Sequence, residues 1–331
     1  MIGQPAFWQN PPDKPGWKAT VLSPLSALYA YGTRRRVAQP PVHTAKVPVI
    51  CVGNINVGGT GKTPTVIALI EHLSERAVHV VSRGYGGREA GPLRVDEKRH
   101  SANAVGDEPL LLSAFAPVWV AKDRAAGVRA AEQDGAEVII LDDGFQNPSV
   151  AKTLSVVVVD AQTGFGNARV LPGGPLREPI AAGLARADML LSIGDDAAQS
   201  SFLSRWSQNI TVPHVTGQLH PLETGMDWAG LRVMAFAGIG NPQKFFDALT
   251  QLGTDVVRAE PLADHAPLST ALMNRFTREA NDLSAQLVTT EKDAVRLPKR
   301  YRQSVLTLPV RLKIDQTDAL DRTLNQIFAS D

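Results

Sequence analysis

The sequence predicts a doubly wound α/β fold, with a P-loop NTPase-like mostly parallel sheet, a smaller C-terminal α/β domain and a separate N-terminal segment. Three observations carry this prediction. Short apolar strands alternate with helices from residue 47 onward, a glycine-rich turn joins the first strand to its helix, and a second alternating set starts near residue 225. Continuous apolar strands separated by helices are typical of a parallel sheet that is covered on both faces.

The N-terminal segment, residues 1–46, differs in composition from the rest of the chain. Its first fifteen residues include four prolines, and an apolar stretch at 17–31 leads to three arginines at 34–36. Apolar residues recur there at helical spacing, at Val21, Leu25, Leu28 and Tyr29. An apolar face beside a basic cluster is typical of a helix in a bilayer interface. A helix packed on the protein's own core explains the pattern equally well, so the residues alone leave both alternatives open.

The predicted core begins with an apolar strand at 47–53 that runs into a glycine-rich turn. The glycines of this turn can adopt positive φ and have no side chain, so backbone N–H groups can surround phosphate oxygens. Lys62 then supplies a positive charge for the β- and γ-phosphates, and the Thr63 hydroxyl can bind Mg²⁺. The predicted phosphate-binding residues are Asn56, Val57, Gly58, Gly59, Thr60, Gly61, Lys62 and Thr63.

The strict P-loop pattern has glycine where this chain has Asn56. Asparagine tolerates the left-handed region better than most residues, so this departure is compatible with the motif. Because the turn lies between a strand and a helix, as phosphate binding requires, a glycine-rich connection without a ligand is the weaker interpretation. The sequence therefore predicts a nucleoside triphosphate site.

The remaining elements divide the chain into three parts. Strands are predicted at 78–84, 117–123, 137–144, 154–161 and 189–194, with helices at 62–73, 110–115 and 124–133 and a β-ribbon at 210–219. A second α/β set covers 231–249, 286–293 and 305–314. The predicted domains are the N-terminal segment 1–46, the P-loop core 47–225 and the C-terminal domain 226–331.

Two acids follow the apolar strand that ends near residue 142. The carboxyl edge of a parallel sheet is where the P-loop lies, and an acid there can hold Mg²⁺ against the β- and γ-phosphates. Asp142 is the predicted metal ligand, with Asp143 and Gln146 as neighbours that orient water or metal. Capping of a helix by the aspartates is the structural alternative.

Other candidates are weak when each is considered alone. Asp107 and Glu108 open a predicted helix, so Asp107 can be a helix cap. His265 is a single histidine, and such residues are often ordinary surface or core groups. Arg124 and Arg177 adjoin glycine- or proline-bearing connections, where most arginines are solvated.

Composition excludes several classes of protein. The chain has 331 residues, enough for about two domains, and a net charge of +1, which argues against nucleic acid as a partner. Cys51 is the only cysteine, so an intramolecular disulfide cannot form. The first ten residues lack the basic region of a secretory signal, and no run of about 18 apolar residues predicts a spanning helix.

Eight motifs occur in an order that resembles the tetraacyldisaccharide 4′-kinase family. They are GNINVGGTGKTP, SRGYGG, GDEP, LDDGFQ, LPGGPLREP, AGIGNP, ADH and TTEKD. The resemblance spans nearly the whole chain, and eight motifs in register are hard to obtain by chance. The proline-broken apolar N-terminus also resembles the membrane-associating helix of that family, which favours the interfacial alternative.

The resemblance implies a function. Such an enzyme is an ATP- and Mg²⁺-dependent kinase that phosphorylates the 4′-hydroxyl of a tetraacylated glucosamine disaccharide 1-phosphate, giving lipid IVA in lipid A biosynthesis. It implies a Gram-negative source, a place at the cytoplasmic face of the inner membrane, and partners that are the lipid substrate and the membrane surface. No obligate protein partner is inferred.

The resemblance also implies roles for particular residues. Asp107 acts with His265 to activate the sugar hydroxyl, and Lys62 acts on the transferred phosphate. Glu108 and the acids of the LDDGFQ motif match the metal and phosphate region. Arg124 and Arg177 match positions near phosphate charge. The TTEKD motif belongs to the pattern, but no role for it follows from the sequence.

This chain departs from the family pattern at two positions. Ala266 stands where a second histidine is often found, which leaves His265 alone to form the pair with Asp107. Asn147 stands where histidine often follows the LDDGFQ motif. Asparagine still offers hydrogen bonds there, although it cannot exchange a proton at neutral pH.

Two other classes compete with the kinase interpretation. One is a P-loop ATPase that switches conformation and binds membrane, as partitioning-type ATPases do. Those proteins resemble KGGxGK[ST], whereas Val57 precedes the glycine pair here and no second lysine reads the phosphates. The other is a soluble small-molecule kinase or synthetase with a related P-loop, which membrane fractionation would distinguish.

Overall fold

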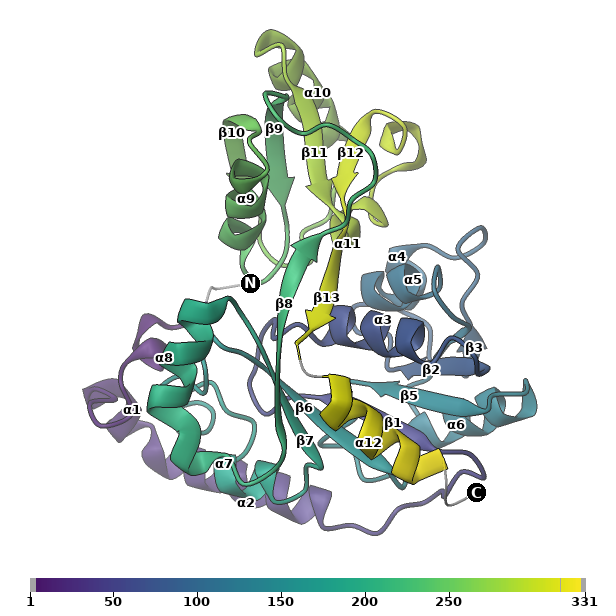
Figure 1. The fold of residues 1–331 in the computed structure, drawn as a ribbon, viewed down its shortest axis with the longest axis vertical. Coiled ribbons are helices and arrows are strands. Elements are labelled where there is room, and N and C mark those ends of the chain that lie inside the picture. The colour runs from purple at the N-terminus through teal and green to yellow at the C-terminus, as the bar shows by residue number, and fades with distance from the viewer. Residues whose placement is uncertain (1–3, 316, 329–331) are drawn as a thin grey trace.

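The structure, a computed structural model, describes residues 4–315 and 317–328, and it contains two α/β units (Figure 1). The lower unit in that view holds a nine-stranded sheet, and the upper unit a four-stranded one. The predicted fold class is confirmed. Residues 1–3 of the predicted N-terminal segment and residues 329–331 of the predicted C-terminal domain lie outside the described residues.

The large sheet has the strand order β13-β8-β7-β6-β1-β5-β2-β4-β3. Its seven central strands are parallel, and the two edge strands β13 and β3 run antiparallel to their neighbours. The bounds are β1 Val49–Gly53, β2 Val78–Ser82, β3 Leu93–Arg94, β4 Val118–Val120, β5 Val138–Asp142, β6 Leu154–Asp160, β7 Met189–Ile193, β8 His214–Pro221 and β13 Val310–Ile314.

Alternating residues of β1 face the two sides of the sheet, as the pleat requires. Ile50 and Val52 join one core cluster, whereas Val49 and Cys51 join the other. The first cluster lies under α3 (Lys62–His72), α4 (Ala102–Val105), α5 (Asp107–Leu112) and α12 (Thr317–Phe328). The second lies under α6 (Arg124–Gln133), α7 (Ile180–Leu184) and α8 (Asp196–Trp206), which the 3₁₀ turn η2 (Ser207–Asn209) follows. The sheet is therefore doubly wound.

The upper unit is a parallel sheet with the order β10-β9-β11-β12. Its strands are β9 Arg232–Ala237, β10 Asp255–Pro261, β11 Gln286–Thr290 and β12 Val305–Leu308. Its helices are α9 Pro242–Gln251, α10 Thr270–Asp282, α11 Glu291–Ala294 and the 3₁₀ turn η3 Lys299–Tyr301. Two apolar clusters, one on each face, form a core separate from that of the large sheet.

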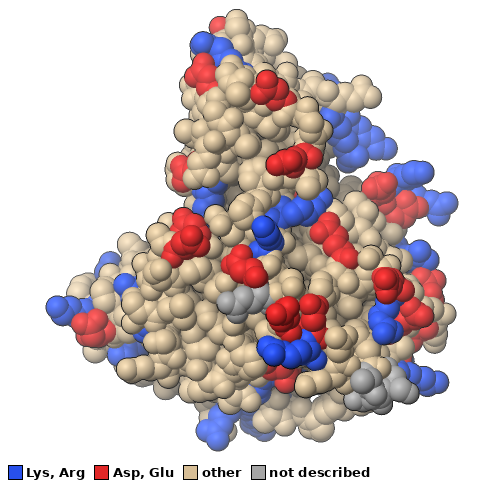
Figure 2. Space-filling model, in the orientation of Figure 1, with Lys and Arg blue, Asp and Glu red and all other residues tan. Residues whose placement is uncertain are grey.

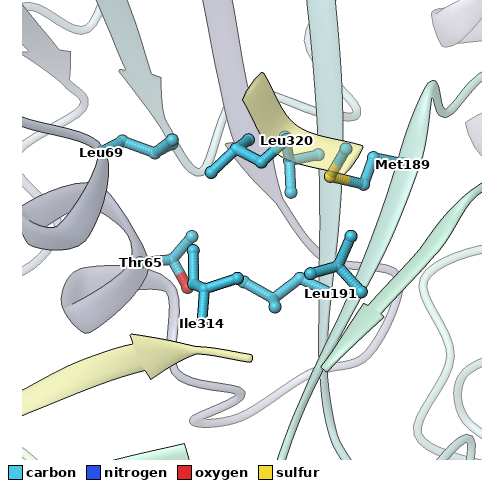
Figure 3. A pocket seen from close by; sticks show the side chains of 8 residues that line it. Thr65, Leu69, Met189, Leu191, Ile314 and Leu320 are labelled. Atoms are coloured by element: carbon cyan, nitrogen blue, oxygen red, sulfur yellow. The ribbon is translucent and has the colours of Figure 1, made fainter. Parts of the chain in front are cut away.

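The chain returns to the large unit after β12, which differs from the predicted C-terminal domain 226–331. Strand β13 pairs antiparallel with β8, and Leu320 and Leu324 of α12 are buried in the core of the large sheet. Figure 3 shows this packing: Leu320 and Ile314 line a cavity of about 10 Å³ together with Leu69 and Met189 of the large sheet and its helix. So small an apolar cavity stays dry. The last strand and helix thus belong to the large unit, because their apolar side chains complete its core.

The N-terminal segment consists of the 3₁₀ turn η1 (Ala6–Gln9) and the helices α1 (Trp17–Val21) and α2 (Ser23–Val37), drawn in purple in Figure 1. On these helices the buried residues are small or polar, and the large apolar residues are exposed. Ala19, Ser26 and Thr33 are buried, and the Ser26 hydroxyl accepts a hydrogen bond from the Gly173 N–H at 3.0 Å. The exposed large side chains on the two helices are Trp17, Val21, Leu25, Leu28, Tyr29 and Tyr31. Their apolar face is therefore not packed on the protein core.

Among the described residues, no helix is both long enough and apolar enough to cross a bilayer. On the face drawn in Figure 2, acidic and basic side chains are interspersed over the lower unit.

Candidate active site

The candidate site lies where the carboxyl ends of β1, β2 and β5 meet the upper unit. In open α/β sheets ligands bind outside this edge. The upper unit approaches the P-loop there: Gly240 Cα would lie 3.9 Å from a Cβ placed on Gly59. The ammonium of Lys244 on α9 also lies 2.8 Å from the Asp160 carboxylate at the end of β6. The site thus lies at the interface of the two units, which we call the cleft.

The P-loop joins β1 to α3 as predicted. Gly58 and Gly61 have φ of 105° and 93°, values that a residue with a Cβ adopts only with strain. Gly61 is the N-cap of α3, so the free N–H groups of the first turn, where Thr63 lies, point toward the loop. Lys62 opens this helix, and its Nζ is 3.8 Å from Asp143 Oδ1.

The middle of the P-loop is fixed by neighbouring segments. Asn56 is not left-handed; its amide instead donates to the Gly164 carbonyl at 2.9 Å. Asparagine is therefore used here for a side-chain bond, and the explanation from backbone conformation is wrong. The Thr60 hydroxyl accepts from the Asn54 amide at 3.0 Å, and the Val57 N–H donates to the Pro175 carbonyl at 2.8 Å.

The two acids after β5 have opposite electrostatic environments. Asp142 is buried, and its Oδ2 accepts from the Ser82 hydroxyl at 3.0 Å. Burial, together with the charges of Glu108 and Asp143, raises the pKa of Asp142 to about 7. Burial also acts to raise the pKa of Asp143, but the charges of Lys62 and Arg177 outweigh it and hold that pKa below its usual value. The structure therefore brings the predicted acids to the P-loop lysine.

Arg177 and Gln146 form a hydrogen-bonded group with Asp143. The Arg177 guanidinium donates to Asp143 Oδ1 at 2.8 Å and to Oδ2 at 3.2 Å, a bidentate pair. It also donates to Gln146 Oε1 at 3.1 Å, and the amide nitrogen of Gln146 donates to the Asn54 carbonyl. Gln146, predicted as a metal neighbour, thus has its amide oxygen bonded to an arginine.

Arg124 is buried and contacts the backbone of the two acids, not their carboxylates. It is 4% exposed, and its Nη2 donates to the carbonyls of Asp142 and Asp143 at 3.0 and 2.8 Å. Asp143 has a left-handed φ of 52°, which costs energy for a residue other than glycine. Arg124, predicted near phosphate charge, therefore holds the strained turn that presents the acids.

Asp107 and His265 meet across the cleft, 158 residues apart in sequence. His265 Nδ1 lies 2.8 Å from Asp107 Oδ2 and 3.1 Å from Oδ1. Asp107 is the first residue of α5 and is buried. His265 has a φ of 59°, and its backbone N–H donates a hydrogen bond to the Gly238 carbonyl. Among the described residues, Asp143 and His265 are two of only four non-glycine residues with positive φ. Such strain concentrates at functional sites.

Asp107 and His265 each shift the pKa of the other. Burial acts to raise the pKa of Asp107, but the hydrogen bond from His265 and the charges of Lys292 and Arg296 lower it overall. The same hydrogen bond raises the pKa of His265, against the effects of burial and of Lys292. The carboxylate is therefore ionised at neutral pH and held by the imidazole.

Glu108, predicted near the metal, lies between two groups of charges. Its Oε1 is 3.1 Å from the ammonium of Lys292, and its charge contributes to the raised pKa of Asp142. Within residues 4–315 and 317–328, no set of three or more His, Cys, Asp and Glu side chains is arranged as a metal site. The sequence did not predict Lys292, Arg296 or Ser82 as site residues, and the TTEKD motif was the only signal that could have indicated Lys292.

The fold and these contacts define a P-loop phosphotransferase with a carboxylate–histidine pair where its two units meet. A family model described as tetraacyldisaccharide-1-P 4′-kinase matches residues 18–329. The chain belongs to this family of kinases, whose members phosphorylate a lipid A precursor. The family indicated by the eight motifs is thus confirmed.

Individual relatives agree with this assignment. The chain is 62% identical over 327 residues to a tetraacyldisaccharide 4′-kinase of Dinoroseobacter shibae, covering 98% of this chain and 97% of the relative. It is 57% identical over 326 residues to one of a Jannaschia species, covering 98% of each. A crystal structure of LpxK from Aquifex aeolicus in complex with ATP is 28% identical, with a TM-score of 0.76 over 94% of this chain and 99% of that one.

Proposed function

We propose that this kinase transfers the γ-phosphate of ATP to the 4′-hydroxyl of a tetraacylated glucosamine disaccharide 1-phosphate, giving lipid IVA. The observation that carries the proposal is the contact between Asp107 and His265, whose carboxylate and imidazole atoms lie 2.8 Å apart across the cleft that also holds Lys62. A hydroxyl becomes a nucleophile when a positioned base removes its proton, and an ionised carboxylate beside an imidazole suits that task.

The steps assigned to the chain are few, because phosphoryl transfer requires alignment and charge stabilisation more than covalent chemistry. Lys62 and the backbone N–H groups of 58–61 bind the β- and γ-phosphates. Asp107 accepts the proton of the sugar hydroxyl, and His265 orients Asp107 through Nδ1. Closure of the upper unit on the P-loop brings acceptor and phosphate into line and excludes water.

Mg²⁺ fits the residues at the carboxyl edge. The buried Asp142 carboxyl has its pKa raised to about 7 by burial and two neighbouring carboxylates, so a divalent cation there relieves the repulsion that favours its protonated form. We propose that the Asp142 carboxylate and the Thr63 hydroxyl would hold this ion, with phosphate oxygens and water as its other ligands, and that it would neutralise charge on the phosphates. Asp143 and Glu108 are bonded to Arg177 and Lys292, so they contribute negative charge beside the ion rather than direct ligands. Gln146 is assigned instead to the orientation of Arg177.

The outward apolar face of α1 and α2 supports a membrane role for the N-terminal segment. Trp17 is 72% exposed and Leu28 is 68% exposed, an arrangement that is costly in water and favourable in a bilayer interface. Three arginines end α2, where they can contact anionic headgroups. We propose that the enzyme acts at the cytoplasmic face of the inner membrane and takes its acylated substrate from that surface.

A direct assay tests the proposed reaction. Purified protein is incubated with [γ-³²P]ATP, Mg²⁺ and the tetraacylated disaccharide 1-phosphate in detergent, and labelled lipid is separated by thin-layer chromatography. We expect a bisphosphorylated product with wild-type protein and its near-complete loss with Asp107→Ala. Hydrolysis of ATP without labelled lipid would contradict the assignment and favour a switching ATPase.

A further inference from the structure

Four of the five residues in the TTEKD segment, 289–293, are anchored by their side chains. Three bond within the upper unit: Thr289 to the Phe236 carbonyl, Thr290 to the Asp293 N–H, and Asp293 to the Gly238 N–H. Glu291 bonds instead to Arg311 on β13 of the large unit. Asp293 is fully buried and also pairs with Arg296. Lys292 is the remaining residue, and the segment holds its backbone fixed beside the cleft.

Lys292 contacts both halves of the site. Its Nζ lies 3.1 Å from Glu108 Oε1 on α5 of the large unit and 3.4 Å from His265 Nε2 in the upper unit. It is also 3.7 Å from Asp264 Oδ1, and its side chain is only 19% exposed. A lysine that is mostly buried among carboxylates retains its charge, so it acts as a donor only.

The two neighbours of His265 decide where its proton lies. The Asp107 carboxylate is an acceptor, so the nitrogen facing it, Nδ1, carries hydrogen. The Lys292 ammonium is a donor, so the nitrogen facing it, Nε2, accepts and carries none. Asp264 Oδ1 is 3.6 Å from Nε2, beyond hydrogen-bond distance, so a second N–H on this ring would have only the ammonium within reach.

We propose that Lys292 is a positioning residue that holds His265 in the Nδ1–H form and joins it, through Glu108, to the large unit. This inference rests on the proposed transfer reaction and deepens it. Because Nε2 is engaged by Lys292, His265 has no free nitrogen with which to take the proton of the sugar hydroxyl. Asp107 is left as the acceptor, and Lys292 explains why the carboxylate rather than the imidazole fills that role.

A spectroscopic experiment tests the proton position without turnover. Protein labelled with ¹⁵N-histidine is examined by long-range ¹H–¹⁵N correlation, and the His265 signals are assigned by their absence in His265→Gln. Spectra are recorded at a pH above the raised pKa of His265, where the ring is neutral, and there we expect a protonated Nδ1 and an unprotonated Nε2 in the wild-type protein. Lys292→Met keeps a side chain of similar length but removes the hydrogen-bond donor, and in this variant we expect signals of Nε2 protonation to appear. Lys292→Arg should keep the wild-type pattern.

Kinetics of the same variants test the consequence. Lys292→Met should lower kcat by about a hundredfold with KM for ATP unchanged, because the pair loses alignment while the P-loop is intact. Lys292→Arg should recover most of the loss. The exposed Lys299 of η3 provides a matched control, since Lys299→Met removes a lysine of the same unit and should leave kcat unchanged.

Several outcomes would overturn the proposal. They are a protonated Nε2 in the wild-type protein, an unchanged His265 pattern in Lys292→Met, and a loss confined to KM for ATP. The wild-type spectrum decides the proton position even if Lys292→Met folds poorly. If the expected pattern is found in a protein that does not phosphorylate the disaccharide, the proposed reaction fails and the positioning role of Lys292 in the site remains.

Discussion

The ammonium of Lys244 lies 2.8 Å from the Asp160 carboxylate and joins the two units beside the P-loop. Lys244 is on α9, directly after the 238–241 loop that approaches Gly59. The Asp160 carboxylate also accepts a hydrogen bond from the Gln162 N–H, so its orientation does not depend on Lys244 alone. The pair therefore favours the closed arrangement of the cleft.

Lys244→Glu should open the cleft, because it places two like charges at this contact. The pair is partly exposed, so its own contribution is about 1 kcal/mol or less, but repulsion adds to the loss. We expect a larger radius of gyration in small-angle scattering at low salt and a raised KM for ATP. Lys299→Glu changes charge equally in the same unit and should alter neither. Identical scattering from all three proteins would contradict the role given to this contact.

Lys62→Ala should lower kcat by about a hundredfold or more, because charge grows between the β- and γ-phosphates and stabilisation of this kind contributes ~3 kcal/mol. The fold should survive, since Lys62 opens a helix whose apolar face is otherwise unchanged. Circular dichroism and the kinase assay make the measurement, with the exposed Lys98→Ala as control. Near-normal turnover of a folded Lys62→Ala protein would rule out the P-loop assignment.

The Asp107–His265 contact predicts strong non-additivity. Alanine at either position should reduce kcat far more than it changes the affinity for ATP, because neither side chain is assigned to the nucleotide. Residues that act as a unit lose most of their effect with the first substitution, so the double variant should be little worse than the worse single one. A double-mutant cycle on kcat makes the test, and fully multiplicative losses would return Asp107 to the role of a helix cap.

The neighbouring acids predict opposite effects of pH on stability. Between pH 3.8 and about 7, unfolded Asp142 is ionised while folded Asp142 is protonated, so its contribution falls as pH rises. Asp142→Asn should therefore stabilise the protein at pH 8.5, by up to about 4 kcal/mol for the full shift, and by less at pH 5. Urea unfolding with chelator and without nucleotide measures it.

Asp143→Asn is the matched control for that experiment. The pKa of Asp143 is lowered in the folded state, so its contribution is present above its unfolded pKa and is lost as pH falls through the folded one. Asp143→Asn should therefore destabilise the protein at pH 8.5. If both substitutions changed the free energy of unfolding at pH 8.5 in the same direction, the two acids would share one electrostatic environment, which would contradict the structure.

Serine at Val21, Leu25 and Leu28 should release the protein from membranes. These side chains are exposed, so the triple variant should fold normally, whereas deletion of the segment would also remove the bond between Ser26 and Gly173. Flotation with anionic vesicles makes the measurement. Replacing the arginines at 34–36 with glutamine should reduce binding mainly at low salt. A triple variant that still floats with the vesicles would exclude this face as the anchor.

The sequence predicted the core well because local chemistry determines it. A parallel strand buried on both faces reads as an apolar run, and the P-loop glycines need positive φ wherever the loop occurs. Asn56 shows the limit: its role depends on the carbonyl of Gly164, more than one hundred residues away. Arg124 was placed near phosphate for the same reason, since only the folded chain reveals the carbonyls it binds.

The resemblance to a family supplied the pairing of Asp107 with His265, which no spacing rule could supply. Each residue is ordinary in its local segment, and their contact forms only when two units with separate cores come together. Lys292 was missed because a lysine in a short polar motif is usually solvated. The burial of its neighbour Asp293, which fixes the segment, is a property of the upper unit and not of the motif.

The return of β13 and α12 to the large sheet makes the upper unit an insertion within the nucleotide-binding unit. Both of its connections therefore run side by side, through β8 and β13, and the inserted unit is tethered at two points. A stop codon after residue 225 would remove an edge strand and the helix that buries Leu320, so it would not yield an isolated P-loop unit. Excision of residues 223–308, with a short turn joining β8 to β13, is the shortening that preserves the large core.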